Sequence, residues 1–431
     1  GAAEEMEQVC KYVEVDGKVM ELTPHLRKQL RQVNLRLNKQ GMRVLTVAVK
    51  RDAHADAVYS VEDEQDMIMI GFMGFLDPAK ETAKTAIASL HGHGINVKVL
   101  TGDNAIVAQK VCRDVGIDAD EYLLGTDIDH LSDEELAEKA AKTNLFAKLN
   151  PMQKSRIIET IQAAGHTVGF MGDGINDAPA LRTADVGISV DTAADITKDA
   201  SSIILLEKSL NVLDKGVIEG RKVFTNMMKY IKMTLSSNFG NVFSILVARA
   251  FLPFLPMLSI QLLVQNLVYD MAQLTIPWDN VDKEELEKPV KWQVGGLLKF
   301  TVGIGPVSSI FDILTFFMMW HVFSANTIQE QALFQAGWFM IGLTTQTLVV
   351  HMIRTRKLPF IKSIASPAVL ISSVLAIVVG FLVILTPLHT VFDFAALPSS
   401  YWPWYVGINL AYLVTVEFAK RIYIHVTREW I

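Results

Sequence analysis

The chain has 431 residues, of which 50% are apolar and 20% charged, and its formal net charge is −6. That charge argues against nucleic acid as the main partner, because nucleic-acid binding needs a basic stripe. A mean hydropathy of +0.28 is too high for an ordinary soluble enzyme and too low for a chain embedded entirely in a membrane. The two cysteines, Cys10 and Cys112, exclude a disulfide framework and indicate a reducing compartment. The chain has no signal-peptide pattern and no initiator Met, so we expect it to begin inside a longer gene product.

The first half, to about Tyr230, has the pattern of an α/β protein. Apolar strand-like runs cover residues 43–49, 67–72, 97–100 and 167–170. Amphipathic helical patterns cover residues 81–91, 105–115, 133–142 and 153–164. Strands separated by helices of this length predict a parallel sheet. The charge is denser before Gly71, which predicts a domain boundary close to that residue.

The second half has the pattern of a membrane domain. Six apolar runs cover residues 233–252, 257–276, 300–320, 333–353, 367–386 and 401–419. Each is near the roughly 20 residues that a helix needs to cross a bilayer, and six in succession argue against buried core helices. Lys and Arg gather at 354–362 and 420–428 and are absent from 324–331 and 388–400. The positive-inside rule therefore predicts that residues 1–230, the linker 279–299 and the C-terminus are cytoplasmic.

Three elements of the first half indicate phosphate chemistry, and the first is Thr101-Gly102-Asp103. It follows the apolar run 97–100 and precedes a helical pattern. Such a turn directs a hydroxyl and backbone N–H groups at an anion, and the helix N-terminus adds partial positive charge. Most turns of this composition are only helix caps, so this element is weak by itself.

The second element is Lys154, in the first turn of a helical pattern that begins at Pro151. A Lys in that place is able to neutralise a phosphoryl group as a compact point charge. Taken alone, a solvated surface Lys is the simpler interpretation.

The third element is Gly172-Asp173-Gly174-Ile175-Asn176-Asp177, which follows the apolar run 167–170. Two glycines allow a sharp turn at the carboxyl end of a strand, where α/β sites lie. Two carboxylates four residues apart are hard oxygen ligands suited to Mg²⁺. A simple Asp- and Asn-rich turn does not explain why the strand, the glycines and both acids coincide.

In this order, the three elements resemble the haloacid-dehalogenase-like phosphorylation domain of P-type ATPases. Residues 172–181 are similar to the family's Gly-Asp-Gly-x-Asn-Asp-Ala-Pro-Ala-Leu signature, and Thr101-Gly102-Asp103 matches its Thr-Gly-Asp motif. Asp77-Pro78-Ala79-Lys80 resembles its Asp-Pro-Pro-Arg motif, and Gly1-Ala2-Ala3-Glu4 the tail of its Lys-Gly-Ala-x-Glu motif. Residues 346–355 are most similar to the bacterial magnesium-transporting branch.

The resemblance implies the fold and the domains. The fold class is an α/β haloacid-dehalogenase-like (Rossmann-type) phosphorylation domain with part of a nucleotide-binding domain, followed by six transmembrane α-helices. Residues 1–70 would be the C-terminal part of the nucleotide-binding domain, 71–215 the phosphorylation domain, and 216–431 the stalk and membrane domain.

The resemblance also implies roles in phosphoryl transfer, with ATP and Mg²⁺ as cofactors. Asp173 would hold the catalytic Mg²⁺, and Asn176 and Asp177 would order the phosphate site, Asp177 with its carboxylate toward the metal. Thr101, Gly102 and Asp103 would hold phosphoryl oxygens, and Lys154 would balance their charge. Nucleotide binding would involve Arg43 and, at the hinge between the two cytoplasmic domains, Asp77.

One departure from the family is large, because the Asp-Lys-Thr-Gly-Thr motif that carries the phosphorylated Asp is absent. Asp127-Ile128-Asp129 resembles the Asp-x-Asp of soluble phosphatases, but it follows the Thr-Gly-Asp element and no apolar strand precedes it. The family's actuator domain and first four membrane helices are missing as well. We therefore expect this chain to be the C-terminal part of a pump, whose N-terminal half is its partner.

Polar residues inside the predicted spans indicate a transport path, because charge within a membrane is costly. Asn266 and Asp270 lie one turn apart in the second span, and Asn238 and Asn241 lie three residues apart in the first. These positions match those of the ion ligands in related calcium pumps, and Asn241 replaces a carboxylate there. Such amides also join helices by hydrogen bonds, which is the alternative interpretation. Asp312 is a second polar site or a partner for a neighbouring helix.

The leading hypothesis is an ATP-driven pump of the inner (plasma) membrane that moves Mg²⁺ into the cytoplasm through an aspartyl phosphate. Membrane lipid and the transported Mg²⁺ would be its other partners, with no nucleic acid. The first alternative is a Ca²⁺ pump of the same family. A membrane-anchored phosphatase needs a nucleophile that the chain lacks, and a non-catalytic sensor would not need the intact Asp173–Asp177 set.

Overall fold

The computed structural model describes residues 1–431 except 52–59, 77, 288, 290–293, 429 and 431. The chain forms two compact units, Gly1–Gly216 and Val217–Ile431. Asp77, which we expect at a hinge, lies outside the described residues.

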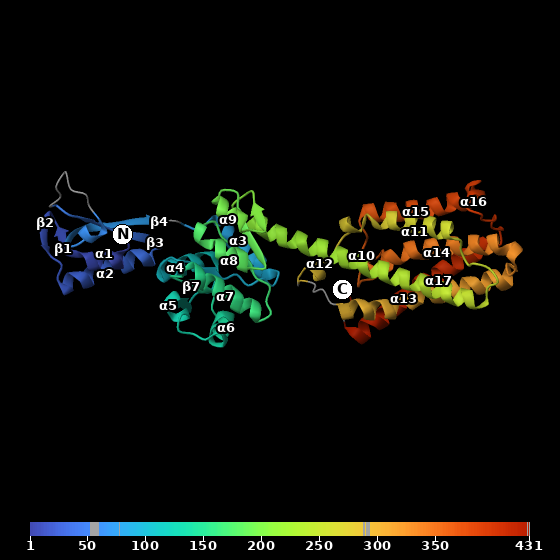
Figure 1. Ribbon diagram of the computed structural model, residues 1–431, viewed down its shortest axis with the longest axis horizontal. Coiled ribbons are helices and arrows are strands. Elements are labelled where there is room, and N and C mark those ends of the chain that lie inside the picture. Colours follow the sequence, from blue (N-terminus) through green and yellow to red (C-terminus); the bar gives the residue numbers. More distant parts are fainter. Residues whose placement is uncertain (52–59, 77, 288, 290–293, 429, 431) are drawn as a thin grey trace. The chain divides into compact units, whose positions relative to one another are not determined.

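The first unit begins with a four-stranded sheet of order β2-β1-β4-β3. Its elements are α1 (Ala3–Val9), β1 (Cys10–Val15), β2 (Lys18–Glu21), α2 (Pro24–Lys39), β3 (Met42–Val49), η1 (Val61–Asp63) and β4 (Met67–Leu76). Helices α1 and α2 lie on one side of this sheet (Figure 1), where Cys10, Val13 and Met69 form the core. Because β4 passes through residue 70, the sheet ends later than the predicted boundary, and the division into domains there stays a prediction.

The rest of the first unit has two parallel sheets, β5-β7-β6 and β10-β9-β8, so the prediction of parallel pairing is confirmed there. The prediction is wrong for the runs 43–49 and 67–72, because they form β3 and β4, which pair antiparallel. Their strands are β5 (Val99–Leu100), β6 (Tyr122–Leu124), β7 (Leu145–Ala147), β8 (Gly169–Met171), β9 (Val186–Val190) and β10 (Ile203–Leu205). The helical elements are α3 (Glu81–Gly92), α4 (Ala105–Val115), α5 (Gly125–Ile128), α6 (Asp133–Lys142), α7 (Pro151–Ala163), η2 (Ile175–Asp177), α8 (Ala178–Thr183) and α9 (Asp195–Asp199).

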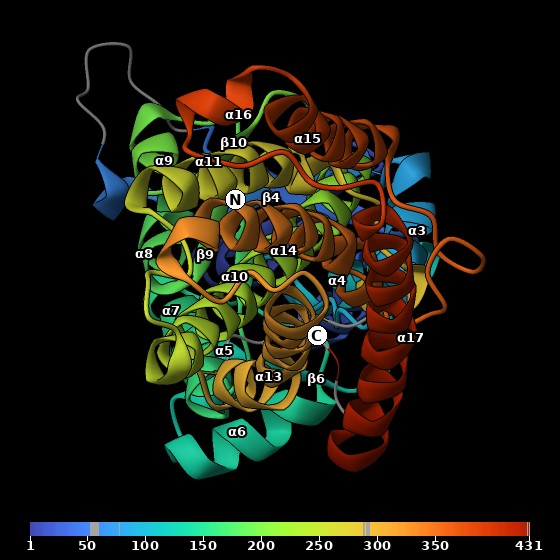
Figure 2. The same cartoon turned by 90° about the vertical axis from the view of Figure 1, so that its right-hand side faces the viewer.

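The second unit is a helical bundle. Its elements are α10 (Leu210–Phe251, most of which belongs to this unit), α11 (Ser259–Gln273), η3 (Ile276–Trp278), α12 (Lys283–Leu286), α13 (Val294–Phe317), η4 (Met318–Val322), η5 (Ile328–Glu330), α14 (Gln331–Ile353), α15 (Pro367–Leu385), α16 (Leu388–Val391) and α17 (Tyr401–Thr427). Viewed end-on in Figure 2, α14 lies in the middle of the bundle, with α10, α11, α13, α15 and α17 around it. Consistently, 94% of the most apolar stretch of α14 is buried, against 33% of that of α15.

Each of the six predicted spans is largely helical, but the described residues contain three helices long and apolar enough to cross a membrane. They are Val294–Val322, Ile328–Ile353 and Pro367–Leu385. The chain is therefore a membrane protein with several candidate spans. The other three spans stay a prediction: α11 has 15 residues, and α10 and α17 are long enough but not apolar enough to count as candidates.

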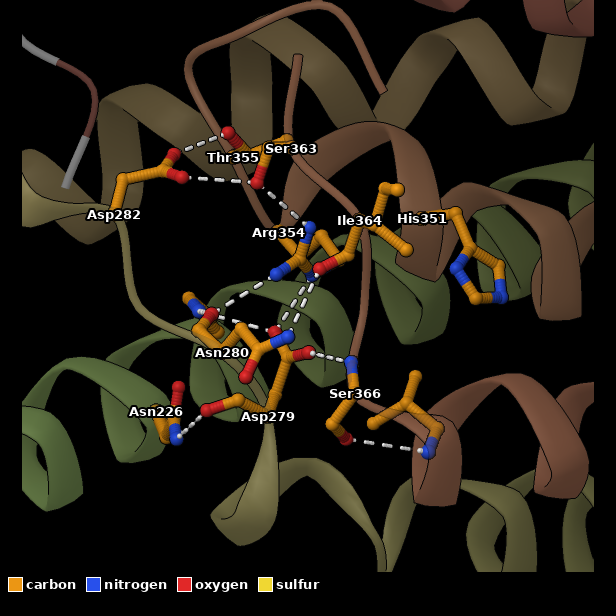
Figure 3. A network of polar contacts seen from close by, with 12 residues as sticks. Asn226, Asp279, Asn280, Asp282, His351, Arg354, Thr355, Ser363, Ile364 and Ser366 are labelled. Atoms are coloured by element: carbon orange, nitrogen blue, oxygen red, sulfur yellow. Dashed lines mark hydrogen bonds and ion pairs between the residues drawn. The ribbon is translucent and has the colours of Figure 1, made fainter. Parts of the chain in front are cut away.

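A buried ionic network holds the linker that follows α11 (Figure 3). Asp279 Oδ2 accepts hydrogen bonds from Lys229 Nζ at 3.1 Å and from Arg354 Nε at 2.6 Å, and the backbone N–H of Ser366 donates to Oδ1. Burial raises the pKa of Asp279, but the two cations outweigh it and hold that pKa below its usual value. Close by, Asp282 accepts from Thr355 and Ser363. The linker is thus fixed by charge to α10 and to the end of α14.

Candidate functional site

The turn after β8 is built around Asp177. Its Oδ2 accepts a hydrogen bond from the backbone N–H of Gly174 at 3.3 Å, which closes the single turn η2. A Cβ at Gly172 would lie 2.7 Å from Asp177 Cβ, closer than real Cβ atoms approach. The glycine is therefore required by a close contact with the acid that follows it in the motif.

The second and third motifs meet in an ion pair. Lys154 Nζ donates to Asp177 Oδ1 at 2.7 Å, and the two side chains are only 12% and 15% exposed. Lys154 lies in the first turn of α7, which Asn150 and Gln153 begin with a reciprocal capping box. The structure thus brings together a cation and a carboxylate 23 residues apart in sequence.

Asp173 is exposed and forms an ion pair with Lys208. Our sequence analysis missed Lys208, although a signal existed. Lys208 follows β10, Asp173 follows β8, and the two strands flank β9 in one parallel sheet. The carboxyl ends of parallel strands share one edge, so residues just after β8 and β10 are expected to lie near each other.

The Thr101-Gly102-Asp103 turn lies against the start of α7. The backbone N–H groups of Leu149 and Lys148 donate to the carbonyl oxygens of Thr101 and Asp103 at 3.0 and 3.1 Å. Thr101 Oγ1 accepts from the backbone N–H of Asp103, so at present the hydroxyl closes its own turn. Among the described residues, no contact joins this turn to Asp173 directly. The turn is thus bonded to the residues just before α7, and Lys154 lies in the first turn of that helix.

The remaining predicted head residues lie at the surface. Asn176 is exposed. Arg43 Nη1 lies 3.8 Å from Asp103 Oδ1, and both side chains are more than half exposed, so this ion pair is weak. The rejected pair, Asp127 and Asp129, has structural partners: Asp127 caps α5 by accepting from the backbone N–H of Leu124, and Asp129 accepts from Gln153.

The donor set of the head fits Mg²⁺. Within the described residues, no group of three or more His, Cys, Asp and Glu side chains is arranged to hold a metal. Mg²⁺ is usually bound by one or two carboxylates together with water and phosphate oxygens, so a larger protein cage is not needed. Asp173 and Asp177 are carboxylates on one short turn, and each forms an ion pair with a lysine.

The four residues of the predicted transport path are not all brought together. Asn238, Asn266 and Asp270 lie on exposed faces of α10 and α11. Asn241 instead accepts a hydrogen bond from Gln346 Nε2 of α14 at 2.6 Å. The sequence analysis used Gln346 only as the first residue of the family-like stretch 346–355 and did not predict a role for it in the transport path. Glu417 lies in the predicted span 401–419 and pairs with Lys420 and Arg421.

Comparison with known proteins defines the family. Residues 7–185 match the family described as haloacid dehalogenase-like hydrolase, and residues 254–422 match the family described as cation transporting ATPase, C-terminus. Together with the phosphate-site motifs, these matches show that the chain belongs to the P-type ATPases and corresponds to their C-terminal region.

The names of individual relatives state which ion each relative transports. The chain is 53% identical over 423 residues to magnesium-transporting ATPase, P-type 1 of Escherichia coli K12. The aligned residues make up 98% of this chain and 47% of the relative. It is 52% identical over 432 residues to a protein of the same name from Salmonella typhimurium LT2, covering 100% and 48%. Calcium-transporting ATPase 1 of Bacillus cereus is 28% identical over 444 residues, covering 97% and 50%. The chain thus spans about half the length of these relatives.

Proposed function

We propose that this chain is the C-terminal region of an ATP-driven pump that moves Mg²⁺ into the cytoplasm. The observation that carries the proposal is the contrast in identity: 53% to a magnesium-transporting ATPase against 28% to a calcium-transporting one, each over nearly the whole chain. The phosphorylated Asp, the actuator domain and the first membrane helices would come from the N-terminal half of the same pump.

In the head, the proposal assigns phosphoryl transfer to positioning and charge neutralisation. Lys154, held by Asp177, would balance the charge of the phosphoryl group, and the turn at Thr101, Gly102 and Asp103 would bind its oxygens. Asp173 and Asp177 would hold Mg²⁺, which supplies positive charge to the phosphoryl oxygens when bound. Asn176 would order the same turn. Arg43, together with Asp77 beyond the described residues, would contact ATP.

In the membrane, Asn238, Asn241, Asn266 and Asp270 are proposed to bind the transported Mg²⁺. Three amides and one carboxylate give a site of low charge, which suits a cation that keeps part of its water shell. The exposure of Asn238, Asn266 and Asp270 on α10 and α11 supports a site that is completed by other helices. The distribution of Lys and Arg supports an inner-membrane orientation with residues 1–230 and the C-terminus in the cytoplasm.

The test uses the full-length protein that carries this sequence, in proteoliposomes with the head outside. Mg²⁺ or Ca²⁺ is varied in the lumen while Mg²⁺ outside is held constant, so that the catalytic Mg²⁺ does not change. We expect luminal Mg²⁺ to stimulate ATP hydrolysis, and Asp270→Asn to weaken that stimulation about tenfold or more while inorganic phosphate still forms the phosphoenzyme.

The matched control is Asp393→Asn, which changes an exposed carboxylate outside the bundle and should behave as wild type. Stimulation by Ca²⁺ instead of Mg²⁺ would favour the calcium pump. If Asp270→Asn responds to Mg²⁺ as wild type does, Asp270 is structural and the proposed path is wrong.

A further inference from the structure

Asp312 of α13 is a buried carboxylate without a cationic partner. It is 6% exposed and lies within the apolar segment Val294–Val322. Trp338 Nε1 donates to its Oδ1 at 2.8 Å, and Ser244 Oγ donates to its Oδ2 at 2.6 Å. Among the described residues, no Lys, Arg or His forms an ion pair with it. Neutral donors orient this carboxylate, but they do not balance its charge.

The carboxylate borders a small closed pocket between α10, α13 and α14. The polar residues that line it are Ser236, Asn241, Ser308, Asp312, Thr345 and Gln346. Its volume is 10 Å³, which corresponds to about one water-sized ligand. The pocket is therefore large enough for one small ion and too small for an organic molecule.

Two further oxygens at this pocket have no partner in the part of the chain that the structure describes. Ser236 Oγ and Gln346 Oε1 are buried and make no hydrogen bond to any described residue, and their residues are 6% and 7% exposed. The other end of the Gln346 amide is fixed, because its Nε2 donates to Asn241 Oδ1. A buried polar atom is costly to leave unpaired, so a ligand that pairs with these two oxygens would stabilise the bundle.

We propose that this pocket is a cation site in which the Asp312 carboxylate and the neutral oxygens of Ser236 and Gln346 bind one Mg²⁺ ion. A bound cation would balance the negative charge of Asp312 and would also be coordinated by the oxygens of Ser236 and Gln346. A water molecule would pair with those oxygens but would leave the Asp312 charge unbalanced. Hard oxygen ligands and the small volume match Mg²⁺, the smaller of the two divalent ions considered. The identity of the ion rests on the proposed function. The site is separate from Asp270, and Asn241, which belongs to the proposed path, lines it.

The experiment counts bound Mn²⁺, used as a paramagnetic probe for Mg²⁺, by electron paramagnetic resonance. The full-length protein in lipid nanodiscs carries Asp173→Asn throughout, to weaken metal binding in the head. We expect Asp312→Asn to remove one bound Mn²⁺ per protein, Gln346→Met to weaken that ion about tenfold or more, and added Mg²⁺ to displace it. Asp393→Asn is the control and should change nothing.

The results separate this inference from the proposed function. Loss of one Mn²⁺ in Asp312→Asn but none in Asp270→Asn supports the pocket and contradicts the site at Asp270. The reverse result overturns the pocket, makes Asp312 a neutral partner of Trp338 and Ser244, and leaves the pump intact. Loss of one ion in each variant supports both sites. If Asp312→Asn does not elute as a folded protein, Gln346→Met decides, and unchanged Mn²⁺ binding in that variant overturns the proposal.

Discussion

Asp177 contacts more of the candidate residues in the first unit than its neighbours in the motif do, through Lys154 and Gly174. It binds Lys154 with one carboxylate oxygen and the Gly174 backbone with the other, and it leaves no room for a side chain at Gly172. The motif is therefore a packing unit, and a change at Gly172 would act by moving this carboxylate.

Gly172→Ala tests that dependence. The new Cβ would displace Asp177, and overpacking of this kind costs about 1–3 kcal/mol. We expect a lower thermal unfolding midpoint and loss of phosphoenzyme formation from inorganic phosphate in the full-length protein. Gly92→Ala is the control, because nothing lies within 4 Å of its added Cβ and it should fold and phosphorylate normally. Equal behaviour of the two variants would contradict the close-contact argument.

At the scale of elements, the linker between α11 and α13 depends on Asp279. Asp279→Ala would leave Lys229 and Arg354 buried without their counter-charge, which costs about 3–5 kcal/mol. Glu284→Ala on the same linker removes an ion pair with Lys357 in which Glu284 is 63% exposed, so it should change stability far less. Thermal unfolding in detergent compares the two variants. A similar loss in both would mean that the buried network does not anchor the linker.

The neighbouring Glu285 makes the stability of this linker depend on pH. Its pKa is raised from 4.5 to about 7, chiefly by burial, with smaller increases from Asp282 and Glu284 and opposing decreases from Lys229 and Arg354. Since the folded state binds this proton more tightly than the unfolded chain, its contribution is complete below the unfolded value and is lost as pH rises toward 7.

Glu285→Gln removes this titration. We expect the variant to be more stable than wild type at about pH 8 and no more stable at about pH 5, measured by the thermal unfolding midpoint. Glu287→Gln, an exposed neighbour, should show no such difference between the two conditions. A gain of the same size at both values would assign the effect to packing and not to the charge.

For the whole molecule, periodicity and motif order were enough to predict the α/β head, the parallel pairing of its two later sheets and the helices of the second unit, but not the antiparallel pairing of β3 with β4. Helices at 105–115 and 133–142 begin and end where the pattern placed them, because caps and apolar spacing are local signals. The strand predicted at 67–72 continues to Leu76, since pairing with β3 extends it beyond its most apolar part. Strand length here depends on a partner distant in sequence.

The site was less predictable than the fold. Lys154 and Asp177 belong to motifs that were predicted to lie at one phosphate site, but the ion pair between them was not predicted. No role was predicted for Lys208 or Gln346, and each reaches its partner through a long side chain across a tertiary contact. Only the order of the strands or the packing of the helices places such residues, and neither is written in local sequence.

The burial of α14 has a consequence for how the protein is made. A helix surrounded by other helices has little contact with lipid, and α14 carries Gln335, Thr345, Gln346 and His351. During synthesis it emerges before α15 and α17, whose residues later bind it: Ser373 pairs with His351, and Lys420 donates to the carbonyl oxygen of Met352. Until those helices arrive, its polar groups need temporary partners in the insertion machinery. Assembly of this bundle therefore depends on α15 and α17, because they supply hydrogen-bond partners for the polar groups of the central helix α14.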